Sequence, residues 1–183
     1  MVVIVSSFTV RDNLEGTVVS TSGRRRHLFI SHHHRDDALV DKFTKLLGSK
    51  GWDVRNSSIR AKPANQQRLD NGMVSDSVIR RLLRMKVSWA STVVVLIGKQ
   101  THQRPWVNWE IDQAHAQGKR IVGVYEQGGK ESDIPESLEK YASAIVGWNS
   151  NSIVDAIDSG ENTFQNPDGT TRDTINGAAN SEC

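Results

Sequence analysis

Apolar residues along the chain form short continuous runs that alternate with segments of helical periodicity. The short runs at 27–31, 52–54, 92–98, 120–125 and 144–146 are typical of buried strands. Between them, apolar residues recur every three or four positions, which predicts helices over 39–47, 74–87, 106–117, 135–141 and 150–157. Because strands and helices alternate throughout, the pattern predicts an α/β domain whose parallel sheet is covered by helices on both faces.

The run Thr92-Val93-Val94-Val95-Leu96-Ile97-Gly98 is the clearest strand in the chain. A strand without a polar side is expected in the centre of a parallel sheet. Five such strands favour a flavodoxin-like order, 2-1-3-4-5, in which ligands bind beyond the carboxyl ends of the strands where the order reverses. That point lies between the first and third strands, next to residues 31–34 and 98–100.

The pattern also sets the expected boundaries of the domain. Residues 1–23 contain one apolar stretch followed by Ser, Thr and Gly, and we interpret them as an N-terminal extension. Residues 24–158 form the α/β domain. From residue 159 to 183 the chain is rich in Asn, Thr, Gly, Asp and Ser, a composition that predicts a disordered or loosely attached tail.

Composition adds a few limits. The hydrophobic share of 37% and the charged share of 24% are ordinary for a globular protein. The single cysteine, Cys183, excludes a disulfide within the chain, which fits a reducing cytoplasm. The apolar start of the chain lacks the basic region and cleavage site of a signal peptide, and no apolar run approaches the roughly 20 residues of a membrane helix. We therefore expect a cytoplasmic protein that does not enter a membrane.

Charge is unevenly distributed along the chain. Residues 24–86 carry 15 Lys/Arg against 6 Asp/Glu, whereas residues 121–183 carry 3 against 11. A basic half can serve a phosphate-bearing ligand, and a basic and an acidic half can also stack head to tail between copies. The asymmetry is equally compatible with two solvated faces. Nucleic acid is a weaker alternative, because aromatic residues for base stacking are sparse among the arginines.

The segment Pro105-Trp106-Val107-Asn108-Trp109-Glu110-Ile111 carries the main chemical signal. It opens the helix that leaves the third strand, so Glu110 can face the crevice where the strand order reverses. From the residues alone, a glutamate in the first turn of a helix is most often a surface residue that compensates the helix dipole. Its placement beside the crevice makes it a candidate for chemistry.

Other motifs in the sequence do not support the functions that they first suggest. Three consecutive histidines, His32 to His34, rarely converge on one ion, and no second Cys/His cluster exists, so we expect no metal. Asp36 and Asp37 after the first strand are similar to the acidic pocket of response regulators. The third strand, however, ends without a phospho-accepting aspartate. The sequence has no P-loop, no dinucleotide fingerprint and no nucleophilic-serine motif.

Several segments taken together resemble a known family. They are Phe29-Ile30-Ser31-His32 with the following Asp pair, the Val93–Ile97 strand, the W-x-x-W-E-I segment ending at Ile111, Ile121–Val124, and Val146-Gly147-Trp148-Asn149 with Ser152-Ile153. In this order they are similar to the TIR-like domains of the ThsB type, the NAD-consuming members of Thoeris anti-phage systems. The resemblance covers about residues 26–158 and rests mainly on W-x-x-W-E-I and V-G-W-N.

The resemblance implies a TIR fold and an enzyme that cleaves the bond between nicotinamide and ribose in NAD+, with NAD+ as substrate and no cofactor. It places the catalytic glutamate at Glu110 and the wall of the NAD+ pocket at Ser31 to Asp37, including His32, His33 and Asp36. It also implies a cyclic or conjugated ADP-ribose signal that activates a separate effector protein, and assembly into a homo-oligomer on activation.

For such a substrate, two further side chains fit the chemistry. Trp106, one turn before Glu110, can supply a stacking surface, and Lys99 can take the diphosphate. Val107 and Ile111 are expected on the buried face of the helix, with Trp109 in the core. The alternative function, favoured by the uneven charge, is a TIR-type assembly module without enzymatic activity.

Overall fold

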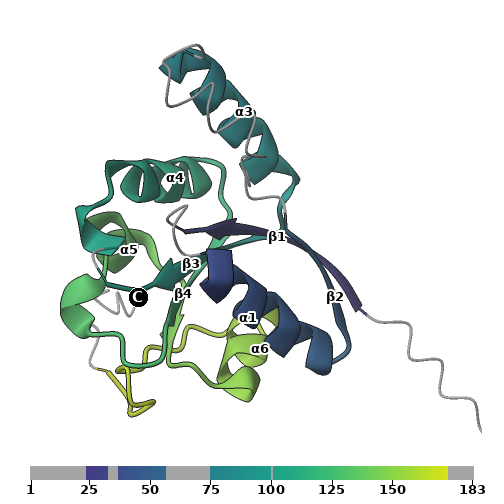
Figure 1. The fold of residues 1–183 in the computed structure, drawn as a ribbon, viewed down its shortest axis with the longest axis vertical. Helices are drawn as coiled ribbons and strands as arrows, with labels where there is room; N and C mark the ends of the chain where they lie inside the picture. The colour runs from purple at the N-terminus through teal and green to yellow at the C-terminus, as the bar shows by residue number, and fades with distance from the viewer. Residues whose placement is uncertain (1–23, 33–36, 57–74, 100, 173–183) are drawn as a thin grey trace, which may run out of the picture.

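The computed structural model describes residues 24–32, 37–56, 75–99 and 101–172, which form a five-stranded sheet with helices on both faces (Figure 1). The strands follow the order β2-β1-β3-β4-β5, and each neighbouring pair is parallel. Their bounds are β1 Arg24–Ser31, β2 Trp52–Asn56, β3 Thr92–Ile97, β4 Arg120–Tyr125 and β5 Ala144–Val146. The expected α/β class with a parallel sheet is confirmed, and the strand order is the one expected from the sequence.

The central strand explains why the sheet has two apolar faces. All six residues of β3 are buried, and alternate side chains point to opposite sides of the sheet. Val94 and Leu96 join one apolar cluster, whereas Val93, Val95 and Ile97 join the other. A strand that is apolar on both sides can only be stable if helices cover both sides.

Helices fill the two layers in the way that this alternation requires. The first layer contains α1 (Asp37–Ser49) and α6 (Ser150–Asp158), and the second contains α3 (Asp76–Trp89), α4 (Pro105–Ala116) and α5 (Glu136–Tyr141). Two short 3-10 helices, η2 (Thr101–Gln103) and η3 (Glu131–Asp133), lie in the connections. Figure 1 shows α1 and α6 side by side on one face, while α3 extends beyond the sheet. None of the described helices is both long enough and apolar enough to cross a membrane.

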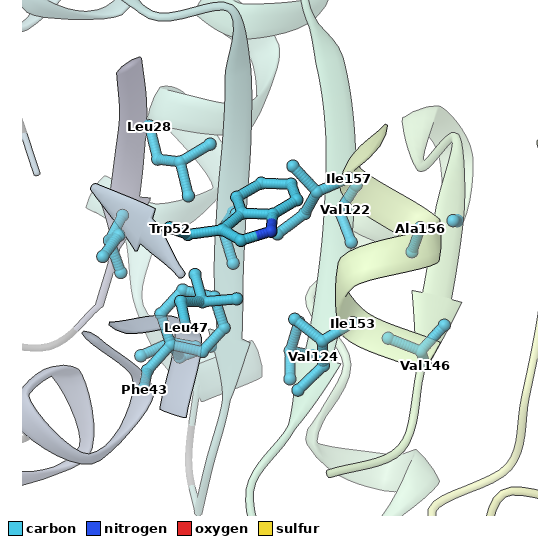
Figure 2. Packing of buried hydrophobic residues seen from close by; sticks show 14 of the residues in the cluster. Leu28, Phe43, Leu47, Trp52, Val122, Val124, Val146, Ile153, Ala156 and Ile157 are labelled. Atoms are coloured by element: carbon cyan, nitrogen blue, oxygen red, sulfur yellow. The ribbon is translucent and has the colours of Figure 1, made fainter. Parts of the chain in front are cut away.

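The layer of α1 and α6 buries the larger side chains (Figure 2). Phe43 and Leu47 of α1 are fully buried, and they belong to the same apolar cluster as Ile153 and Ile157 of α6. Trp52 of the edge strand β2 is only 9% exposed, and its ring extends over the sheet toward Val122 and Ile157 in Figure 2. Burial of a side chain of this size contributes about 1.5–3 kcal/mol to the stability of the fold. The cluster therefore covers the sheet as far as its β2 edge.

The first strand begins earlier than the hydrophobic run predicted. The apolar pattern placed its start at His27, but β1 begins at Arg24, and the three arginines pair in parallel register with Trp52, Asp53 and Val54 of β2. Backbone hydrogen bonding between strands does not require apolar side chains, so the periodicity missed this extension.

The C-terminal segment is the main correction to the predicted boundaries. Residues 159–172 do not form a loosely attached tail, because they return to the outer edge of β5. Ile145 donates its backbone N–H to Thr163 at 2.8 Å, and the Gln165 N–H donates to the Ile145 carbonyl at 2.7 Å. The expectation of a disordered tail stays a prediction for the residues beyond Arg172, because they lie outside the described part of the chain. The predicted N-terminal extension, residues 1–23, also lies outside it.

A buried arginine anchors this segment to the domain. Arg172 is only 8% exposed, and its guanidinium donates to Glu131 at 2.8 Å and to Glu139 at 2.6 Å. The Tyr125 hydroxyl is buried nearby without a hydrogen-bond partner among the described residues. Burial and the two glutamates raise its pKa to about 12, although Arg172 opposes the shift. The segment is thus held by charge-assisted hydrogen bonds as well as by Phe164, which packs against the second apolar cluster.

We expect Arg172→Met to lower the free energy of unfolding by about 2 kcal/mol, between the values typical of exposed and buried ion pairs, since both glutamates are partly exposed. Urea denaturation at pH 7 measures this. Arg81→Met, at an exposed position on α3, is the control and should change the free energy by less than about 0.5 kcal/mol. An equally small effect of Arg172→Met would show that the segment does not depend on this anchor.

Candidate active site around Glu110

The helix that carries Glu110 begins at a proline. Pro105 occupies the first turn of α4, where its fixed φ suits a helix start and its missing N–H is not needed. Val107, Ile111 and Ala114 are buried against the sheet at helical spacing, as expected for the first two. This burial fixes the rotation of the helix and sets Glu110 at the margin of the buried face.

The connection before α4 is also fixed. Thr101 is 4% exposed, and its hydroxyl accepts a hydrogen bond from the Gly98 N–H at 2.9 Å and lies 2.8 Å from the Gly98 carbonyl. The backbone N–H of Thr101 donates to the same carbonyl at 3.1 Å. These bonds close a tight turn between β3 and η2. The position of α4 is therefore set at both its start and its buried face.

A hydrogen bond joins Glu110 to the first strand. Ser31, the last residue of β1, is 1% exposed, and its hydroxyl donates to Glu110 Oε2 at 2.5 Å. The two residues are 79 positions apart in the sequence. They meet because β1 and β3 are neighbours, so that the end of β1 faces the helix that follows β3. This is the crevice where the strand order reverses.

The surroundings of Glu110 change its proton affinity. Burial raises the pKa of its carboxyl to about 7, and the hydrogen bond from Ser31 opposes this rise because it stabilises the charged form. A carboxyl with a pKa near the working pH is common at functional sites. A glutamate that only compensates a helix dipole would be exposed and would keep an ordinary pKa, so the surface interpretation of Glu110 does not fit.

Two tryptophans and two arginines form a stack beside Glu110. The rings of Trp106 and Trp109 meet edge to face at 5.9 Å. The guanidinium carbon of Arg80 lies 5.3 Å from the centre of each ring, and that of Arg84 lies 5.8 Å from Trp109. Trp106 is 38% exposed, whereas Trp109 is half-buried at the edge of the second cluster rather than fully in the core. Cation–π contacts of this kind join α3 to α4.

The remaining predicted site residues are less clearly placed. His32 is half-buried, and its Nδ1 lies 3.1 Å from the Ile30 carbonyl, so that nitrogen acts as the donor. The side chain of Lys99 is exposed, and its backbone N–H donates to Glu126 at 3.1 Å. His33 and Asp36 lie outside the described residues. The structure thus brings Ser31 and Glu110 together, with Trp106 one turn away on the same helix.

Within the described part of the chain, no group of three His, Cys, Asp or Glu side chains could hold a metal ion. Of the three consecutive histidines, only His32 belongs to that part, so the expectation of no metal at His33 and His34 stays a prediction. The site as described consists of a carboxyl group, a hydroxyl donor and an indole surface. Such a set can stabilise a developing positive charge and bind a flat ring.

Comparison with known proteins agrees with this geometry. The family profile described as "Thoeris protein ThsB, TIR-like domain" matches residues 29–131, more than half of the chain. The chain belongs to the ThsB TIR-like family. The match includes both Ser31 and Glu110, so the two residues that meet in the crevice lie within the family domain.

Two individual proteins are similar to this ThsB-type chain. One, from Bacillus cereus (strain MSX-D12), is named "Putative cyclic ADP-D-ribose synthase ThsB1" and is 34% identical over 100 residues, or 55% of this chain and 51% of that protein. The chain thus spans about half the length of this relative. The other is the structure of the Clostridium botulinum CMP N-glycosidase BcmB, with a TM-score of 0.45 and 16% identity over 73% of this chain and 98% of that one. This second likeness is too distant to bear on fold or function.

The structure adds contacts that the sequence did not predict. The hydrogen bond from Ser31 to Glu110 and the stacking of Arg80 on both tryptophans are the clearest. The sequence contains a partial signal for the arginine stacking, because Arg80 and Arg84 are four residues apart and lie on one side of a predicted helix. No comparable signal in a single sequence links Ser31 to Glu110.

The raised pKa of Glu110 predicts a pH-dependent stability. The folded protein holds this proton up to about pH 7, whereas the unfolded chain releases it near pH 4.5. The stability that the proton provides is complete below pH 4.5 and is lost as the pH rises through 7, by about 3 kcal/mol. In Glu110→Gln the side chain has no carboxyl group to titrate, so the free energy of unfolding should not fall in this way.

We expect the free energy of unfolding of Glu110→Gln, relative to the native protein, to rise by about 3 kcal/mol between pH 4.5 and pH 8. Urea denaturation across this range measures the difference. Asp112→Asn, an exposed acidic position on the same helix, is the control and should show no such trend. A constant difference between Glu110→Gln and the native protein would contradict the raised pKa.

Proposed function

We propose that this domain cleaves NAD+ at the bond between nicotinamide and ribose. The observation that carries the proposal is the Glu110 carboxyl group, held by Ser31 in the crevice of a ThsB-type domain with a pKa of about 7. The name of the Bacillus cereus relative points to the same class of reaction. The products are nicotinamide and an ADP-ribose derivative, either cyclic or conjugated.

The reaction requires stabilisation of a positive charge. As the C1′–N bond breaks, its electron pair leaves with nicotinamide and the ribose ring becomes oxocarbenium-like. Ionised Glu110 stabilises this charge, and partial burial strengthens the effect because little water screens it. The acceptor, either water or a hydroxyl or ring nitrogen of the same molecule, then bonds to C1′ and gives up one proton. Cyclisation requires the substrate to fold back on itself in a site that excludes water.

Other residues have supporting roles in this proposal. Ser31 positions the carboxylate, since its hydroxyl donates to one of the two oxygens and leaves the other for the substrate. Trp106 offers an exposed indole face, one turn from Glu110, on which nicotinamide or adenine can stack. Lys99, with its exposed side chain at the end of β3, binds the diphosphate. We assign His32, together with His33 and Asp36, to the wall of the pocket.

The wider role follows from the family. In a Thoeris-type defence system, the ADP-ribose product would act as a cytoplasmic signal that activates a separate effector protein during phage infection. We further propose that the domain forms a homo-oligomer when it is active. These statements rest on membership of the ThsB TIR-like family and on the relative's name.

One observation favours the alternative of an assembly module. Four apolar side chains of α3 are exposed at helical spacing, namely Val78, Leu82, Met85 and Trp89. Such a stripe on a helix is typical of a contact surface between proteins. Light scattering over a salt series, together with NAD+ turnover, separates the two functions. Oligomers without nicotinamide release at any salt concentration would favour the assembly module.

We expect Glu110→Gln to reduce nicotinamide release from NAD+ at least about 100-fold, because the amide cannot stabilise the positive charge. Chromatography with mass spectrometry of the products measures the rate and identifies the ADP-ribose derivative. Asp112→Asn removes a nearby charge from the exposed face of α4 and should retain the native rate. Unchanged activity in Glu110→Gln would exclude this residue as the catalyst.

The pH profile tests the role of Ser31. If ionised Glu110 is required, the rate should rise through about pH 7. Ser31→Ala removes the hydrogen bond that lowers the pKa, so the rising limb should move to higher pH. A purely structural role would lower the rate equally at every pH without moving the limb. Ser88→Ala, which removes an exposed hydroxyl from α3, serves as the control.

A further inference from the structure

A second cleft lies beyond the carboxyl ends of β4 and β5. Its volume is about 490 Å³, within the range of small-molecule sites, and its walls come from the turn after β4, the start of α6 and the segment around 165–169. The residues that line it include neither Glu110 nor Ser31 nor Trp106. The cleft is therefore distinct from the Ser31–Glu110 crevice, and the returning C-terminal segment supplies part of its wall.

The charges in this cleft are negative. Glu126 and Asp168 contribute carboxyl groups, and the described lining residues contain no Lys, Arg or His. Asp168 accepts hydrogen bonds from the backbone N–H and the hydroxyl of Thr170, at 2.9 and 2.7 Å. These bonds lower the pKa of the Asp168 carboxyl, so it is ionised at neutral pH. A phosphate or carboxylate ligand would be repelled here, whereas a cation would be attracted.

The cleft also has an aromatic wall. Trp148 is half-buried and lines the cleft, and its ring meets Phe43 of α1 edge to face at 6.2 Å. This contact orients the indole, whose face can attract a cation in the cleft. Neighbouring polar groups are already engaged. Gln165 accepts from the Gly147 N–H at 3.1 Å, and Asn149 caps α6 by accepting from Asn151 and Ser152. The wall is therefore formed before a ligand binds.

We propose that this cleft binds an organic cation, an amine or guanidinium group attached to an apolar body. Glu126 and Asp168 pair with the charged group, and Trp148 contacts the cation or the apolar body. The ligand differs in charge from the anionic diphosphate of NAD+. The proposal does not depend on NAD+ cleavage, so it can be tested in a variant without that activity.

Glu126 also connects the cleft to the turn before the helix of Glu110. Its carboxylate accepts the Lys99 N–H at 3.1 Å. A Cβ atom at Gly98 would lie 3.1 Å from this carboxyl group, so only glycine lets the turn approach it without displacement. A cation that pairs with Glu126 therefore either shares the carboxylate with the Lys99 N–H or displaces that N–H from it. The backbone amide of Lys99 becomes a reporter of binding.

Three size-matched probes separate charge from shape. Tyramine carries an ammonium group, tyrosol is its neutral alcohol counterpart, and 4-hydroxyphenylacetate is an anion. Titration of ¹⁵N-labelled protein with each probe, followed by two-dimensional NMR, reports on the Lys99 amide and on the Trp148 indole N–H. Trp148→Phe identifies the Trp148 signal among those of the five tryptophans.

We expect saturable binding of tyramine that shifts both signals, and no saturable binding of tyrosol or 4-hydroxyphenylacetate. Glu126→Gln and Asp168→Asn should each weaken tyramine binding about tenfold, as for loss of one charge-assisted hydrogen bond. Both amides retain an acceptor for the Lys99 or Thr170 N–H, so the fold should persist. Glu136→Gln removes a charge from an exposed site on α5 and should leave the affinity unchanged.

Three results would overturn the proposal. Tyramine could fail to bind saturably, or tyrosol could bind as tightly, which would exclude recognition of charge. Alternatively, Glu136→Gln could weaken binding as much as Glu126→Gln, which would indicate attraction to the acidic surface as a whole. Loss of nicotinamide release in Glu110→Gln with retained tyramine binding would show that the cleft binds tyramine without the Glu110 carboxyl group.

Discussion

The fold depends on the burial of β3 from both sides. Each of its six residues is buried, and successive side chains enter different apolar clusters. Removing either helical layer would expose half of this strand to water, at a cost of about 1.5–3 kcal/mol for each side chain. The two layers are therefore interdependent. The position of α4, and with it Glu110, follows from the same requirement, because Val107 and Ile111 pack on the face formed by Val93, Val95 and Ile97.

Within this frame, the Ser31–Glu110 pair is a polar contact in a largely apolar setting. A partly buried carboxyl group without a donor would be costly, and the Ser31 hydroxyl offsets part of that cost. The remaining cost is visible as the raised pKa. Carboxyl groups with a raised pKa are common at functional sites, and the one here belongs to Glu110, the residue on which the proposed reaction depends. The adjoining stack of Arg80 on Trp106 and Trp109 is one of the contacts that join α3 to this helix.

Hydrophobic periodicity predicted the helices and strands well, because nearly every one of them has a buried apolar face. The bounds of β4 and β5 were predicted at the residues observed, and α4 was predicted within one residue at each end. The sequence also placed Glu110 at the crevice. It did not predict the contact with Ser31, because a hydrogen bond between residues 79 positions apart leaves no periodic signal. The 159–172 segment was missed for a related reason. Backbone hydrogen bonds, the Arg172 ion pairs and the single apolar side chain of Phe164 hold it, and none of these produces a repeating apolar pattern.

That segment also has a consequence for how the sheet ends. A short terminal strand such as β5 exposes unpaired backbone groups that can pair with another chain. Here, Phe164 forms a parallel bridge with Ile145, and the Ile145 N–H and carbonyl are both satisfied by residues 163 and 165. The segment thus acts as a cover for the sheet edge. A fragment that ended at Asp158, where the hydrophobic pattern stops, would retain all of the described helices and the five described strands but would present β5 as an open edge for aggregation.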